Sequence, residues 1–209
     1  MSAEELPPCD DLFMKFFDRW YDGDDRKRKG FQATCPDSYS GVYKKGTPAS
    51  QLTPLVGDTL KGVEAQVGRM VEAARSDWAS GVTSRNPVSI EGIGDFDRHY
   101  DAARIRQVID RSKPEEYDND YVVLCIELGA VIGQVLRELR PGLEWVWEWP
   151  YWESYLWDAE TSEQIKVFHW AIKKMSGYGV DDGLVAKLRV VASEEWRNQS
   201  KGQEPETGS

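Results

Sequence analysis

The segment from about Tyr117 to Leu139 constrains the fold more than any other part of the chain, because its first half is apolar on nearly every side of a helix. A helix of that kind has to be covered by other elements on several faces. Gly129 and Gly133 are four residues apart, so they share one face and would let a neighbouring element approach the backbone closely. Pro141 and Gly142 end the segment. We therefore expect a central helix with its neighbours packed around it.

A tryptophan-rich segment follows this helix and predicts a small sheet. Alternate residues between Glu144 and Trp149 are tryptophan, namely Trp145, Trp147 and Trp149. A period of two is that of a β-strand, so the three indoles share one face. Two further strands, at about 155–158 and 164–167, would complete a three-stranded antiparallel meander. The indoles either fill the core against the central helix, which we favour, or form an exposed aromatic platform.

Apolar residues spaced three and four apart predict helices elsewhere in the chain. These helices lie at about 11–21, 58–80, 97–112, 168–176 and 181–198. The expected architecture is α+β, with about six helices packed against the small antiparallel three-stranded meander. We expect three regions: an N-terminal helix plus irregular segment at 1–56, an α+β core domain at 57–198, and a disordered tail at 199–209.

Composition narrows the class of partner. The formal net charge of the 209-residue chain is −10, which opposes binding to nucleic acid and favours encounter with a basic protein. No apolar run is long enough for a membrane span, and the N-terminal residues lack the basic and apolar regions of a signal peptide. Cys9, Cys35 and Cys125 are too scattered for a disulfide framework. We expect a cytoplasmic protein with no nucleic-acid or membrane partner.

Metal and nucleotide sites have weak candidates. Asp95, Asp97 and His99 alternate and would converge on a metal ion if their segment were extended. The alternative, which we favour, is that Asp97 caps the predicted helix at 97–112 and His99 lies exposed in its first turn. The Gly92-Ile93-Gly94 sequence lacks the third glycine of a dinucleotide fingerprint and is interpreted as a turn. We predict no metal and no cofactor.

Nucleophilic catalysis also has one weak candidate. The chain has two histidines, His99 and His169, and Cys125 would meet His169 if their elements pack together in the core. A thiol buried in apolar surroundings has a raised pKa and reacts poorly. We therefore predict no catalytic residue.

Acidic residues surround the tryptophans and define the candidate binding site. Paired carboxylates beside aromatic rings are typical of glycoside hydrolases, and Glu160 belongs to the acids of this segment. Exposed tryptophan and tyrosine rimmed by acid would equally be a hot spot for a protein partner. The predicted partner-binding residues are Glu148, Tyr151, Trp152, Glu153, Trp157 and Asp158.

The stretch from about residue 128 to 170 resembles a family of small bacterial domains of unknown function. In that family a Leu-Gly-x-x-x-Gly helix leads into a Gly-x-x-Trp strand, followed by a meander and a short helix that starts with an aromatic residue or proline. The matching positions are Leu128, Gly129, Gly133, Leu136, Gly142, Trp145 and Phe168. Some small acidic bacterial proteins of this kind are immunity proteins, and the resemblance implies such a role without catalytic residues.

The leading functional hypothesis is a non-enzymatic bacterial binding protein, most concretely an immunity-type inhibitor of a toxin or effector with a basic domain. One alternative is a carbohydrate-like ligand-binding or hydrolytic module that uses the tryptophan-rich hairpin. Another is a structural component of an assembly.

Overall fold

The computed structural model describes residues 5–18, 56–116, 119–147, 151–181 and 183–193. Within these residues the chain forms seven α-helices and one three-stranded antiparallel sheet. The predicted α+β architecture is therefore confirmed.

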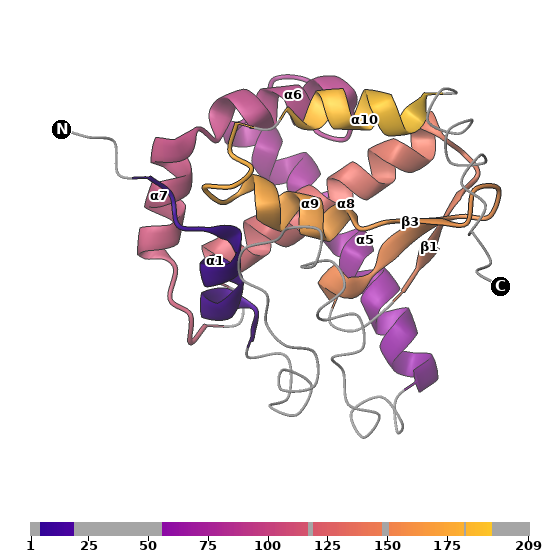
Figure 1. Cartoon of the computed structure of the whole chain (residues 1–209), viewed down its shortest axis with the longest axis horizontal. Helices are drawn as coiled ribbons and strands as arrows, with labels where there is room; N and C mark the ends of the chain where they lie inside the picture. The colour runs from indigo at the N-terminus through magenta and orange to yellow at the C-terminus, as the bar shows by residue number, and fades with distance from the viewer. Residues whose placement is uncertain (1–4, 19–55, 117–118, 148–150, 182, 194–209) are drawn as a thin grey trace, which may run out of the picture.

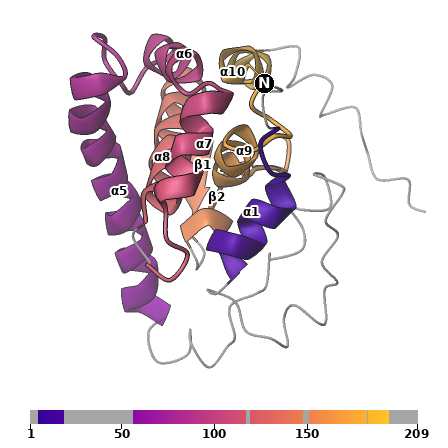
Figure 2. The ribbon, with the colours of Figure 1, turned by 90° about the vertical axis from the view of Figure 1, so that its left-hand side faces the viewer.

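Helix α8 (Asp120–Leu139) is the centre of the molecule. Helix α5 (Val56–Gly81) and helix α9 (Val167–Lys174) pack against it from different sides, as Figures 1 and 2 show. Asn119 begins α8 as its N-cap, because its side-chain oxygen accepts a hydrogen bond from the Val122 N–H at 3.1 Å. The apolar surface that α8 presents on several faces is thus covered, as the sequence predicts.

The two glycines of α8 lie where neighbouring elements come closest. A Cβ atom at Gly129 would collide with Phe168 of α9, and one at Gly133 would collide with the indole of Trp145. Trp145 belongs to strand β1 (Leu143–Val146). The prediction that these glycines allow close approach to the helix backbone is confirmed.

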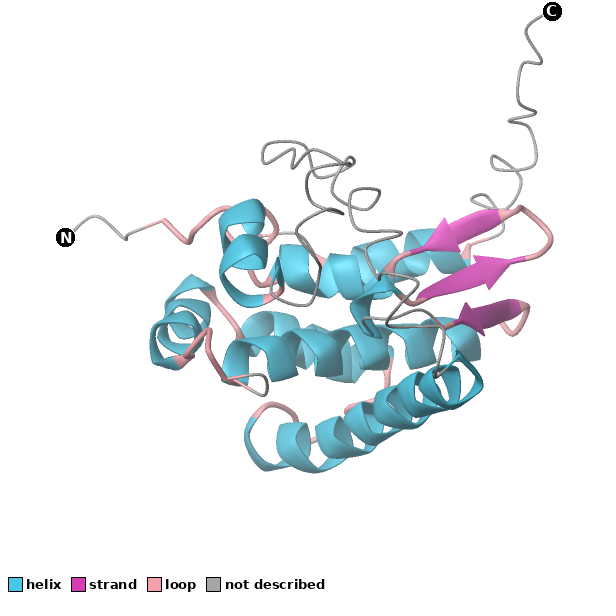
Figure 3. Ribbon diagram, turned by 90° about the horizontal axis from the view of Figure 1, so that it is seen from below, coloured by secondary structure: helices cyan, strands magenta, loops and turns pink. Residues whose placement is uncertain are grey.

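The sheet has the strand order β1-β2-β3 and lies at one end of the helical layer (Figure 3). Strand β2 (Tyr155–Asp158) pairs with β1 so that Leu156 lies opposite Trp145. Strand β3 (Glu163–Ile165) pairs with β2 so that Ile165 lies opposite Leu156. Leu156 and Ile165 are buried, so this face of the sheet looks into the core. A short 3-10 helix, η2 (Tyr151–Glu153), precedes β2.

The strands differ in extent from the prediction. Strand β1 ends at Val146, and Trp149 lies outside the described residues. Strand β3 ends at Ile165, because Lys166 already serves as the N-cap of α9.

The prediction of one helix at 97–112 is wrong, because this region holds the end of one helix and the whole of a second. Helix α6 (Ile90–His99) begins after Ser89, whose hydroxyl accepts the Gly92 N–H at 3.0 Å. Helix α7 (Ala102–Arg111) begins after Asp101, whose carboxylate accepts the Arg104 N–H at 2.9 Å. Two good N-caps at this spacing start two helices.

The glycines of the Gly92-Ile93-Gly94 sequence lie inside α6, so their interpretation as a turn is also wrong. Gly92 packs against the carbonyl groups of Asn86 and Pro87, where a Cβ atom would collide. The glycine therefore serves the packing of α6 on the segment that precedes it.

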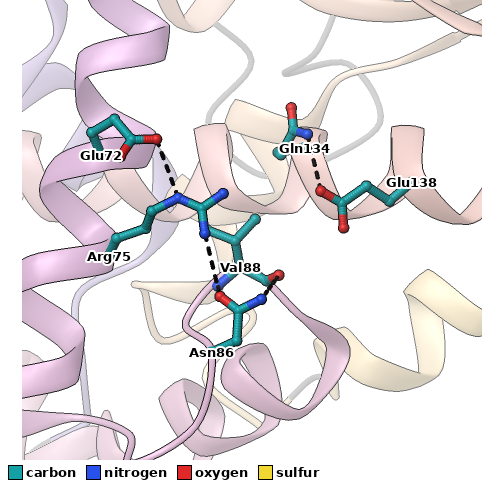
Figure 4. A network of polar contacts seen from close by, with 6 residues as sticks. All are labelled: Glu72, Arg75, Asn86, Val88, Gln134 and Glu138. Atoms are coloured by element: carbon teal, nitrogen blue, oxygen red, sulfur yellow. Dashed lines mark hydrogen bonds and ion pairs between the residues drawn. The ribbon is translucent and has the colours of Figure 1, made fainter.

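The Asn86 side chain shapes that segment, as Figure 4 shows. Its Oδ1 accepts the Val88 N–H at 3.1 Å, and its Nδ2 donates to the Val88 carbonyl at 3.0 Å. Arg75 of α5 donates to both Asn86 and Glu72. These contacts attach the chain that leaves α5 to the helix itself.

The first and last helices complete the described fold. Helix α1 (Cys9–Phe16) begins two residues before the predicted start, and its Phe16 ring lies 4.7 Å from that of Tyr121 on α8. Helix α10 (Leu184–Ala192) begins after Gly183. The predictions for residues 19–55 and 194–209, which include most of the irregular segment and the tail, lie outside the described residues. In the described ranges, no helix has the combined length and apolarity needed to cross a membrane.

Candidate functional site

Trp145 of β1 and Trp147, which follows the strand, form a stacked pair that packs against the core. The rings of Trp145 and Trp147 are 4.8 Å apart and inclined by 15°, and Trp145 lies 5.9 Å from the ring of Phe168. Both indoles are half-buried. The interpretation that these side chains pack toward the central helix is confirmed for Trp145, which fits over Gly133.

Trp152 does not lie at the surface. Its side chain is 0% exposed and meets the ring of Phe17 edge-on at 4.9 Å. The prediction of Trp152 as an exposed contact is wrong, because η2 turns this indole inward against the residues that follow α1. The side chain of Tyr151 and the whole of Glu148 lie outside the described residues.

Glu153 is buried in a cluster of three ionisable side chains, so its prediction as a surface contact is wrong as well. It is 1% exposed, with its carboxylate 3.4 Å from Lys166 Nζ and 3.7 Å from His169 Nε2. Lys166 and His169 belong to the N-terminal end of α9. A carboxylate beside a helix N-terminus is favoured by the helix dipole, so this cluster attaches η2 to α9.

Asp158 is the third predicted contact residue that the structure buries. It forms an ion pair with Arg140, and both side chains are 4% exposed. Arg140 also donates to the Val191 carbonyl at 3.2 Å, and Asp158 accepts the Glu160 N–H at 2.8 Å. The pair therefore joins β2, the end of α8 and α10. Asp158 points inward because the buried guanidinium of Arg140 requires a counter-charge.

Among the predicted contact residues whose side chains the structure describes, Trp157 is the one that remains partly accessible. The register places it directly opposite Glu144 on one side and Gln164 on the other. Tyr155 shares this face, since it is two residues away on the same strand. Glu144 and Gln164 are exposed, while Trp157 and Tyr155 are half-buried. We call these four residues the outer sheet face.

Sequence reasoning missed Glu144 and Tyr155 as members of this surface. The alternation of Glu144 with Trp145 already separates the two faces of β1, and the same rule assigns Tyr155 to the face of Trp157. The alternation could therefore have assigned each residue to a face of its own strand. Only the pairing of β1 with β2 shows that Glu144 and Trp157 lie side by side.

The candidate metal ligands do not converge. Asp95 binds Thr83 and Arg98, whereas Asp97 accepts the Leu184 N–H at 3.0 Å and pairs with Lys174 at 3.2 Å. Asp97 lies inside α6, so the prediction that it caps a helix at 97–112 is wrong. Its carboxylate instead accepts the N–H of Leu184, the first residue of α10. His99 lies in the last turn of α6, so its placement in a first turn is wrong. No group of three or more histidine, cysteine or acidic side chains in the described residues is arranged to hold a metal ion.

The candidate nucleophile and base have different neighbours. Cys125 interacts with the Tyr121 side chain, and burial raises the pKa of its thiol well above the ordinary value. His169 faces Glu153. Cys9 and Cys125 are both buried thiols. A buried thiol with a raised pKa is a poor nucleophile, which agrees with the prediction for Cys125.

No family model matches this chain, and comparison with curated proteins and with solved structures found no match either. The resemblance described above therefore stays a prediction.

Proposed function

We propose that this protein binds a basic domain of another protein through the outer sheet face and inhibits it, in the manner of an immunity protein. The observation that carries the proposal is the register that sets exposed Glu144 directly opposite half-buried Trp157. A carboxylate beside an aromatic ring is well suited to a lysine or arginine side chain, which gains an ion pair and a cation–π contact together.

The distribution of charge supports a basic partner. The buried cations Arg140, Lys166 and Lys174 each pair with a carboxylate, so these pairs add nothing to the net charge. The formal charge of −10 is therefore carried by the other ionisable groups of the chain. A surplus of exposed acid accelerates the encounter with a basic protein and disfavours acidic competitors.

Charge reversal on the outer sheet face tests this proposal. Tagged wild type, Glu144→Lys, Trp157→Ala and Asp110→Lys are used to capture partners from a lysate of the native host, with quantitative mass spectrometry at increasing salt. Asp110 is an exposed residue of α7, which lies away from the sheet in Figure 1, so Asp110→Lys matches the charge change of Glu144→Lys.

We expect one stoichiometric basic protein that Asp110→Lys retains. We expect Trp157→Ala to weaken its binding by about 30-fold, as for an aromatic hot spot. The purified partner's own activity should be inhibited by wild type and much less by Glu144→Lys. Equal capture by all four proteins, or a captured partner whose activity is unchanged, would contradict the proposal.

The Trp145 and Trp147 stack favours a second candidate function, the binding of a flat carbohydrate-like ligand. Two nearly parallel half-buried indoles offer an aromatic surface on which a sugar ring could lie. Saturable quenching of tryptophan fluorescence by a soluble glycan, abolished in Trp147→Ala, would support this candidate. An unchanged spectrum across a glycan panel would exclude the ligands in that panel.

A further inference from the structure

Glu127 is a buried carboxyl group in the middle of the apolar surface of α8. It is 5% exposed, and the residues on either side of it, Ile126 and Leu128, belong to the hydrophobic core. The other buried acids at the centre of the fold, Glu153 and Asp158, have cationic partners. Among the described residues no lysine, arginine or histidine forms an ion pair with Glu127. Such a group is costly to ionise where it lies.

The groups that influence Glu127, or that it influences, come from helix α5 and from the residue that follows α6. Helix α5 contributes the exposed carboxylate of Asp77 and the indole of Trp78, which is 1% exposed. The Trp78 N–H lies close enough to favour the charged form of Glu127, although it makes no hydrogen bond of normal geometry in the described structure. Tyr100 follows α6, and the negative charge of Glu127 raises the pKa of its phenol.

Further charged groups influence Tyr100. Arg104 and Arg111 of α7 and Asp120 of α8 all influence the pKa of its phenol. Arg111 is engaged with Asp120 at 2.6 Å. The arginine with the larger influence on the pKa of Tyr100 is thus paired with a carboxylate other than Glu127.

Burial is the main cause that raises the pKa of Glu127, with the like charge of Asp77 second, and together they bring it to about 7. The ordinary value is 4.5. A carboxyl whose pKa is higher in the folded state favours folding most strongly below its unfolded pKa. This contribution is lost as the pH rises from about 4.5 to about 7.

We propose that the contact between α5 and α8 is a proton-sensitive joint, in which Glu127 is held as the neutral acid and loss of its proton favours release of α5 from α8. The joint is distinct from the outer sheet face. It gives the molecule a response to acidity near neutral pH, at a contact that involves the longest helix of the described fold.

Hydrogen exchange of α5 amides tests the joint, with each rate corrected for its intrinsic dependence on pH. Between pH 6 and pH 8 the opening equilibrium of wild type should increase about tenfold, as linkage requires for a pKa that moves from 4.5 to about 7. Glu127→Gln should remove this increase. Glu138→Gln, which changes an exposed acid of the same helix, should retain it.

A side-chain carboxyl titration by NMR provides a measurement that does not depend on how well Glu127→Gln folds. The Glu127 signal should titrate near pH 7 in wild type, and Asp77→Asn should lower its midpoint by removing the like charge. A Glu127 signal that titrates near its ordinary value would overturn the proposal. So would a tenfold pH response of α5 exchange in a folded Glu127→Gln protein.

Discussion

Gly133 and Gly68 are both helical glycines, yet their surroundings predict opposite effects of substitution. A Cβ atom at Gly133 would collide with Trp145, whereas nothing lies within 4 Å of one at Gly68. Gly133→Ala should lower the free energy of unfolding by about 1–3 kcal/mol through overpacking. Gly68→Ala should raise it by about 0.5–1 kcal/mol, because alanine is the better helix former.

Urea unfolding of the two variants beside wild type measures this difference. If both substitutions shifted the midpoint in the same direction, the close contact between α8 and the Trp145 indole would be refuted.

The sequence predicted some residue-scale features and missed others for a physical reason. Gly129 and Gly133 could be interpreted because a helical period of nearly four places them on one face. Trp152 could not be placed, since it lies in a turn where no periodicity distinguishes inside from outside. The pairing of Asp158 with Arg140 and of Glu153 with Lys166 depends on tertiary packing between separate elements.

At the scale of elements, the Arg140 and Asp158 pair should be important for joining the sheet to the helices. Asp158→Asn leaves the buried guanidinium without its counter-charge, so the free energy of unfolding should fall by about 3–5 kcal/mol. Replacing both partners by apolar residues of similar size, Arg140→Met with Asp158→Leu, should cost much less. Glu116→Ala, which removes an exposed ion pair with Lys113, should have little effect.

A double-mutant cycle in urea, built from Arg140→Met, Asp158→Leu and the variant that carries both substitutions, isolates the coupling between Arg140 and Asp158. Additive effects of the single substitutions would show that the pair contributes no coupling.

Long elements were predicted more reliably than short ones. Helices α5 and α8 carry many turns of apolar periodicity, and the ends of both agree closely with the prediction. Helices α6 and α7 are short, and the break between them depends on one capping aspartate, Asp101. Strand β1 was recognised by its alternating tryptophans, but the alternation could not show where pairing with β2 stops.

At the scale of the whole molecule, α1 shares a core with the helices that follow. Phe16 packs on Tyr121, and Phe17 contacts both Tyr121 and Trp152. The predicted division of the chain at residue 56 stays a prediction, but this packing indicates that α1 unfolds together with α8.

The two buried thiols test that cooperativity. In a Cys35→Ser background, Cys9 reports on α1 and Cys125 on α8, and both are buried. Both should become reactive to iodoacetamide at the same urea concentration, as read by mass spectrometry of the digested protein. Alkylation of Cys9 at a clearly lower concentration would instead show that α1 is a separately unfolding unit.

The contact between Gly133 and Trp145 also selects one alignment of the sheet over another. A shift of β1 by one residue would bring Glu144 or Val146 to the helix and turn Trp145 and Trp147 toward the opposite face. Neither replacement fills the space beside Gly133 as an indole does, and Glu144 would bring a charge to α8. Because Gly133 has no Cβ atom, α8 accepts the Trp145 indole and so favours one alignment of β1 over the others. The correct folding of this hairpin thus depends on a glycine in the neighbouring helix.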